Sequence, residues 1–170
     1  EANVAVTITL LGLKLGSTPT SGGNITIQTS MDVFESNAVA SGNIGGQVDR
    51  VLFEIETTSR VAGRSGVSAT LSFTTTAGGL LHPASNITLE YPANFFVTSL
   101  VPLVSISGDV LGKIEFLTDT FLVFTTSNAT VFASSAVTVT FSGLTLGPAN
   151  GGSAGIAVST SADLVPSRGA

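Results

Sequence analysis

Apolar and polar residues alternate with a period of two along most of this chain, and β-branched and aromatic residues dominate the apolar positions. In the stretch RVLFEIETT, Val51, Phe53 and Ile55 fall on one face of an extended strand, and the residues between them fall on the other. Clusters of Gly, Pro, Asn and Ser interrupt the alternation at the spacing of an all-β sandwich. This pattern predicts strands near residues 4–15, 23–30, 48–58, 67–76, 85–91, 97–107, 113–118, 120–127, 136–146 and 154–161.

One of these strand patterns occurs twice. The stretch AVTITLLGLKLG at residues 5–16 returns as AVTVTFSGLTLG at residues 136–147, and the alignment continues without a gap to the end of the chain. The offset is 131 positions throughout, and 13 of the 35 aligned pairs are identical. Chance would give roughly three identities, and self-similarity at a fixed offset is the sequence mark of a repeat array.

A Gly-rich stretch, ASGNIGGQ at residues 40–47, separates the two copies and predicts a linker or crossover. We therefore divide the chain into an N-terminal β-hairpin at residues 1–39, this linker, and an antiparallel β-sandwich body at residues 48–170, either immunoglobulin-like or jelly-roll-like. Because the hairpin repeats the end of the body, we expect it to belong to a neighbouring domain or to complete one.

Two arrangements follow from the repeat. The chain is either a window of a long tandem polypeptide or a subunit whose first hairpin adds to a neighbouring subunit by β-strand addition. The partners are then adjacent repeats of the same chain or copies of the chain. In both cases the apolar positions of the hairpin should contact a neighbour's core, and these are Val6, Ile8, Leu10, Leu13, Leu15, Ile25 and Ile27.

Composition narrows the classes of function. Charged residues make up only 10% of the 170 residues, the net charge is −5, and the six basic residues are scattered, which argues against nucleic-acid binding. Cysteine is absent, which excludes disulfides and thiolate chemistry. No stretch approaches the ~18–20 apolar residues of a membrane helix, so no membrane contact is expected. No basic-then-apolar leader opens the sequence, so the signal of a secreted form would be cleaved or lie upstream.

Candidate catalytic residues are sparse. His82, the single histidine, precedes Pro83 and is expected in an exposed turn, and no serine stands in a G-x-S-x-G motif. Glu54 and Glu56 share a strand face, as a glycosidase pair would, but a solvated sandwich face explains them equally well. We predict no catalytic residue.

The remaining acidic residues do not form a metal motif. Asp109, Glu115 and Asp119 do not match the spacing of a calcium-binding loop. Asp32 and Asp163 occupy equivalent positions of the repeat, which favours a structural role such as an Asx turn. We predict no metal site and no cofactor.

Three sequons stand at Asn24, Asn86 and Asn128 and are the candidate sites of N-linked glycans. About two sequons would arise by chance in a chain this rich in Asn, Ser and Thr, so their number alone proves nothing. Their placement is more informative, because Asn24 and Asn86 open predicted strands and Asn128 follows one.

The segments VSATLSFTTT, ITLEYPANFF and AVTVTFSGLTLG resemble modules of very long secreted tandem-repeat proteins of algae and environmental microbes. They also resemble subunits of extracellular glycosylated fibrils. The resemblance implies a β-sandwich repeat outside the cell and supplies no catalytic residues. We therefore expect a non-enzymatic structural subunit of an extracellular fibre or surface array, assembled head to tail. The alternative is an adhesin or carbohydrate-binding sandwich, and a hydrolase ranks third because no nucleophile–base pair is present.

Overall fold

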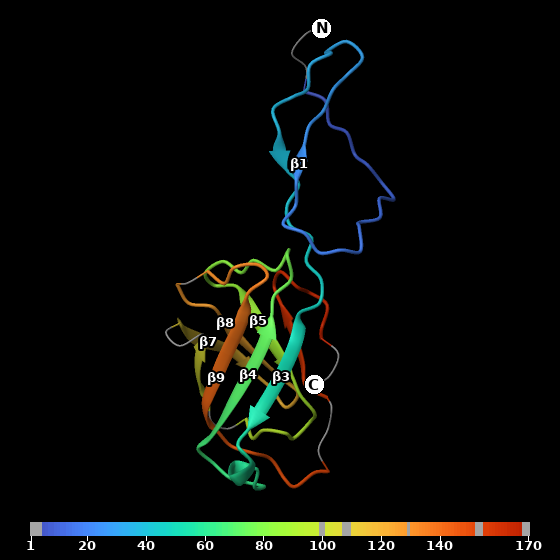
Figure 1. Cartoon of the computed structure of the whole chain (residues 1–170). Coiled ribbons are helices and arrows are strands. Elements are labelled where there is room, and N and C mark those ends of the chain that lie inside the picture. Colours follow the sequence, from blue (N-terminus) through green and yellow to red (C-terminus); the bar gives the residue numbers. More distant parts are fainter. Residues whose placement is uncertain (1–4, 99–100, 107–109, 129, 152–154, 168–170) are drawn as a thin grey trace.

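The computed structural model describes residues 5–98, 101–106, 110–128, 130–151 and 155–167. A strand-rich body follows an N-terminal segment, which stands off one end of the body (Figure 1). Its elements are β1 (Asn24–Ile25), β2 (Val39–Ala40), β3 (Asp49–Ile55), the 3-10 turn η1 (Thr57–Ser59), β4 (Val67–Thr74), β5 (Asn86–Glu90), β6 (Leu103–Ile106), β7 (Val110–Leu117), β8 (Phe121–Thr125), β9 (Ala136–Leu144) and β10 (Ala157–Thr160).

The body is an antiparallel β-sandwich, as the alternation predicted. One layer has the strand order β3-β4-β9-β6-β7, and the other has the order β7-β8-β5-β10, so that β7 contributes to both. β9 therefore lies in the middle of its layer, between β4 and β6, whereas β10 forms an edge beside β5.

The core lies between the two layers. Val137, Val139 and Phe141 alternate inward along β9 and are at most 1% exposed. The ring of Phe141 meets that of Phe124 on β8 edge to face, with centroids 5.6 Å apart, so one aromatic pair joins the two layers. Burial of alternate residues along β4 and β9 shows that the period-two pattern marks the core face.

Several strand predictions are wrong. Residues 5–16 form no strand, the strand expected at 23–30 is reduced to β1, and that at 97–107 is represented by β6 among the described residues. A strand needs a hydrogen-bonded neighbour, and no strand among the described residues pairs with residues 5–16. The other strands lie where the alternation placed them, with ends shifted by a few residues.

The expected hairpin at the end of the body is also wrong in one respect. β9 and β10 belong to different layers and do not pair with each other, because the connection between them crosses from one layer to the other. The duplicated unit is therefore a central strand followed by an edge strand of the opposite layer. Among the described residues, no helix is long and apolar enough to cross a membrane.

Candidate assembly site

The N-terminal segment, residues 5–39, exposes the apolar side chains that the repeat predicted to be contacts. The seven predicted residues are between 54% and 79% exposed. Their counterparts 131 positions later are all buried, with at most 8% exposure, and are Val137, Val139, Phe141, Leu144, Leu146, Ile156 and Val158. Each predicted contact thus corresponds to a core residue of a complete body.

A turn is preserved between the two copies. In the body, Thr160 Oγ1 accepts a hydrogen bond from the Asp163 amide (2.8 Å), and the Thr160 amide donates to the Asp163 carbonyl (2.9 Å). In the N-terminal segment, Thr29 and Asp32 make the same two bonds, at 2.9 and 3.3 Å. The expected Asx turn is therefore a turn closed by the threonine hydroxyl, which leaves the aspartate carboxylate free to reach other segments.

A second pair of hydrogen bonds is also repeated. The Val158 amide donates to Ser167 Oγ (2.9 Å), and the Ser167 amide donates to the Val158 carbonyl (2.8 Å). Ile27 and Ser36 repeat both bonds at 3.0 and 2.9 Å. The second half of the N-terminal segment therefore has the local structure of the body's end without the rest of a body around it.

The backbone also bends at equivalent glycines. Gly143 has φ +83° where the register of β9 against β4 shifts between Val67 and Ala69, and this is the geometry of a β-bulge. Gly12, its counterpart, has φ +73° although no neighbouring strand is present. A left-handed backbone at both positions explains why glycine recurs there.

Asp163 joins three segments of the body. Its side chain is fully buried. Oδ1 accepts a hydrogen bond from the Gly46 amide (2.9 Å), and Oδ2 accepts one from the Thr76 amide (3.0 Å). The Thr76 hydroxyl donates a further bond to Oδ1. The carboxylate therefore fastens the end of β10 to the linker and to the loop after β4, and its acceptors are satisfied as a buried polar group requires.

The glycines around this carboxylate leave no space for a side chain. A Cβ atom at Gly79 would overlap the Asp163 carboxylate, and one at Gly45 would overlap the Ala162 carbonyl. Close approach of neighbouring segments therefore requires glycine at both positions, of which Gly45 belongs to the stretch predicted to be a linker or crossover.

The Gly-rich linker is bonded on both sides. Thr20 and Ile44 exchange two backbone hydrogen bonds of 2.9 Å, which extend the antiparallel pairing of β1 with β2. On the body side, Gln47 and Val165 form a parallel bridge. The chain thus runs in the same direction at Gln47 and at Val165, side by side at this end of the body.

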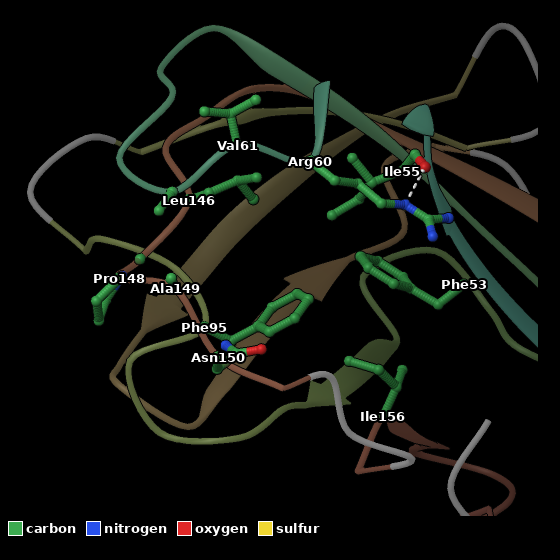
Figure 2. A pocket seen from close by; sticks show the side chains of 12 residues that line it. Phe53, Ile55, Arg60, Val61, Phe95, Leu146, Pro148, Ala149, Asn150 and Ile156 are labelled. Atoms are coloured by element: carbon green, nitrogen blue, oxygen red, sulfur yellow. Dashed lines mark hydrogen bonds between the residues drawn. The ribbon is translucent and has the colours of Figure 1, made fainter. Parts of the chain in front are cut away.

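A pocket of about 400 Å³ is lined by Phe53 and Ile55 of β3 together with other residues (Figure 2). These two residues belong to the end of β3 that lies away from the linker (Figure 1). Phe53 and Phe95 approach each other edge to face across it, with ring centroids 6.3 Å apart. Arg60 lies on its wall, where its Nε donates to the Ile55 carbonyl (2.7 Å). Sequence reasoning missed this pocket, because its walls come from three distant segments that no local motif connects.

The structure does not gather the candidate catalytic residues. His82 is exposed in a loop, and its carbonyl accepts a hydrogen bond from Thr126 Oγ1 (2.8 Å). Glu54 and Glu56 are exposed at the end of β3 and beyond it. Neither glutamate lines the described pocket.

The acidic residues considered for calcium are dispersed or lie on the surface. Glu115 pairs with Lys113 (3.0 Å), Asp119 is exposed in the following turn, and Asp109 lies outside the described residues. In the described part of the chain, no three carboxylate or imidazole groups lie close enough together to hold a metal ion.

The three sequon asparagines have exposed side chains. Asn24 begins β1, Asn86 begins β5, and Asn128 follows β8. This exposure is what a glycan requires, and glycosylation itself stays a prediction. Asn24 corresponds to Gly155 of the body, which is also exposed, so a glycan there is compatible with a completed neighbouring unit.

No family model, curated protein or solved structure matches this chain, and no family is assigned to it.

Proposed function

We propose that this chain is a structural repeat module of an extracellular fibre or surface array, joined head to tail through β-strand contacts. The observation that supports it is the sevenfold correspondence between exposed apolar residues of the N-terminal segment and core residues of the body. Burying these side chains in a neighbouring unit contributes on the order of 10 kcal/mol to the joint.

The direction of the chain supports a linear arrangement. Gln47 and Val165 form a parallel bridge, so the chain runs in the same direction at both positions. In the proposed array, the polypeptide therefore continues past each body in the direction in which it arrived. In such an array, each unit is related to the next by the same rotation and translation. Because repeating this step does not form a closed ring, these heterologous contacts produce a filament.

The surface composition is compatible with this role. Charged residues are few, and the polar surface is rich in Thr, Ser and Asn. In the proposed fibre, Asn24, Asn86 and Asn128 carry glycans that hydrate this weakly charged surface.

The test is to produce three copies of residues 40–170 in tandem and to image them by electron microscopy. We expect straight rods with one density per unit, because each linker is bonded to the units on both sides. A control chain with six Gly-Ser residues inserted at each junction, between residue 170 of one copy and residue 40 of the next, should give bent or hinged particles, since the insertion interrupts the segment equivalent to β2. If images of the chain without the insertion showed neighbouring units at variable angles to one another, they would contradict the proposal.

A second candidate, a carbohydrate-binding or adhesin module, is favoured by the pocket between Phe53, Phe95 and Arg60. Aromatic rings beside an arginine can bind a sugar ring and its hydroxyl groups. A glycan-array screen of the full chain tests it, with Phe95→Ala as the matched variant. A reproducible hit that this substitution abolishes would favour binding over structure. We rank it second because the pocket lies at the end of β3 away from the linker, which meets the next unit in the proposed array.

A further inference from the structure

We propose that Asp32 closes the joint between units, by accepting hydrogen bonds from Gly46 and Thr76 of a preceding unit that lacks its own β9 and β10. This inference rests on the proposed function and names the partner: an open unit equivalent to residues 40–131, which precedes residue 1 in the order of the repeat.

The first argument is the environment of the two aspartates. Asp163 is fully buried and accepts hydrogen bonds from two amides and a hydroxyl of other segments. Asp32 has the same turn geometry but an exposed side chain, and in the described residues its carboxylate accepts a bond only from Thr29 Oγ1 (3.3 Å). The turn therefore presents Asp32 as Asp163 is presented, without the donors that Asp163 meets.

The second argument identifies the partner as an open unit. In this body, β9 already lies between β4 and β6, and β10 already lies beside β5. Residues 5–16 cannot take the equivalent place on such a body unless β9 leaves it, and β9 has the advantage of covalent attachment. A complete second copy is therefore the wrong acceptor.

The third argument concerns chain order. In the body, β9 and β10 follow β8 along the polypeptide. A unit completed by residues 5–36 therefore has its equivalents of β3 to β8 ahead of residue 5. The Gly46 and Thr76 positions of that proposed unit lie in those preceding elements, in agreement with the absence of such donors to Asp32 among the described residues.

The experiment extends the full chain by placing residues 40–131 ahead of residue 1, which restores the 131-residue period. Tyr91→Phe in the second body leaves the added unit with the only tyrosine, and no tryptophan is present, so tyrosine fluorescence in urea reports the added unit alone. Hydrogen exchange at the amides of residues 8–10 reports the new central strand. We expect exchange about a hundredfold slower than in the single-unit chain.

The decisive variant is Asp32→Ala. In the extended chain it should lower the urea midpoint of the added unit by about 1 M, because buried donors lose their acceptor. In the single-unit chain it should leave the midpoint of the body unchanged. Glu35→Ala, at a neighbouring exposed carboxylate whose counterpart is Pro166, is the matched control and should change neither.

A variant of the donor separates a specific contact from a general loss of folding. Thr76→Val in the added unit removes one hydroxyl donor, and its effect should be less than additive with that of Asp32→Ala. If the effects of Thr76→Val and Asp32→Ala on the urea midpoint were fully additive, the inference would be overturned. Slow hydrogen exchange at residues 8–10, together with a urea midpoint that Asp32→Ala does not change, would overturn the role of Asp32 as well. That result would still agree with a tandem array. Fast exchange at residues 8–10 in the unsubstituted extended chain would show that the open unit is not the partner, and the imaging of tandem units would then decide the proposed function separately.

Discussion

One residue type in one local turn has two environments in this molecule. Thr29–Asp32 and Thr160–Asp163 make the same backbone and hydroxyl hydrogen bonds, yet only Asp163 is buried. The local turn is therefore encoded by neighbouring residues, and burial is added by segments that lie far away in the sequence. Removal of the two carboxylates should have unequal effects in this chain.

We predict that Asp163→Ala lowers the free energy of unfolding of the single-unit chain by about 3 kcal/mol, because two amides and a hydroxyl lose a buried acceptor. Asp32→Ala should change it by less than about 0.5 kcal/mol, as expected of an exposed surface position. Urea denaturation of both variants measures the difference. Equal effects would contradict the distinct roles given to these residues.

Tyr91 offers a second test at the residue scale. Its ring is 3% exposed beside Phe95 and Phe96, and its hydroxyl donates to the Thr118 carbonyl (2.7 Å). Burial raises the pKa of Tyr91 to about 12, and the nearby charge of Asp119 acts in the same direction.

This shift predicts a loss of stability at high pH. Below pH 10, the phenol keeps its proton in the folded and the unfolded chain, so its contribution is constant. Above pH 10, only the unfolded chain releases the proton, and the free energy of unfolding falls by up to about 2 kcal/mol as the pH approaches the folded pKa. Absorbance at a wavelength specific for tyrosinate follows this single tyrosine directly. In Tyr91→Phe the part of the alkaline loss due to Tyr91 should disappear, and an ordinary tyrosine pKa in the folded chain would refute the burial argument.

At the scale of elements, the repeated sequence pattern forms strand β9 in the body but no strand at residues 5–16. β9 pairs with β4 and β6, whereas residues 5–16 pair with no strand in the described part of the chain. Alternation states which residues share a face, but the hydrogen bonds of a strand come from adjacent strands. Gly12 nevertheless has a positive φ, as Gly143 does, although residues 5–16 form no strand.

Truncations at equivalent positions should therefore differ in cost. Phe141→Ala removes a fully buried ring that contacts Phe124, and we expect a loss of about 3–5 kcal/mol in the free energy of unfolding. Leu10→Ala, at the equivalent exposed position, should cost less than about 0.5 kcal/mol in the single-unit chain. Chemical denaturation followed by far-UV circular dichroism compares the two. A large loss in Leu10→Ala would mean that the N-terminal segment packs on its own body.

At the scale of the whole molecule, the body closes its own core while the N-terminal segment does not. Among the described residues, the buried apolar side chains all lie at or beyond Val48, and the N-terminal segment contributes twelve exposed large apolar side chains from Val6 to Val39. The proposed joint would bury these exposed side chains.

We predict that a chain of residues 45–170, which keeps the Gly46 donor to Asp163, folds with an unfolding midpoint equal to that of the full chain. The full chain should bind a hydrophobic dye through the exposed apolar side chains of its N-terminal segment, and the shortened chain should not. Dye fluorescence and urea denaturation are the measurements. A shortened chain that is less stable than the full chain would mean that the N-terminal segment stabilises its own body, and a shortened chain that binds the dye equally well would mean that this segment does not provide the exposed apolar surface.

The sequence by itself determined the all-β class and the core faces of β4 and β9, because these follow from periodicity. The fixed repeat paired seven apolar residues of the N-terminal segment with seven core residues, and their role as assembly contacts stays a prediction. The sequence did not determine which strands pair: β9 and β10 read as a hairpin, and only the folded chain places them in opposite layers. The buried role of Asp163 and the pocket beside Phe95 also depended on tertiary structure. The physical reason is that alternation and turn chemistry are local, whereas hydrogen-bond donors, pocket walls and strand neighbours come from segments far apart in the chain.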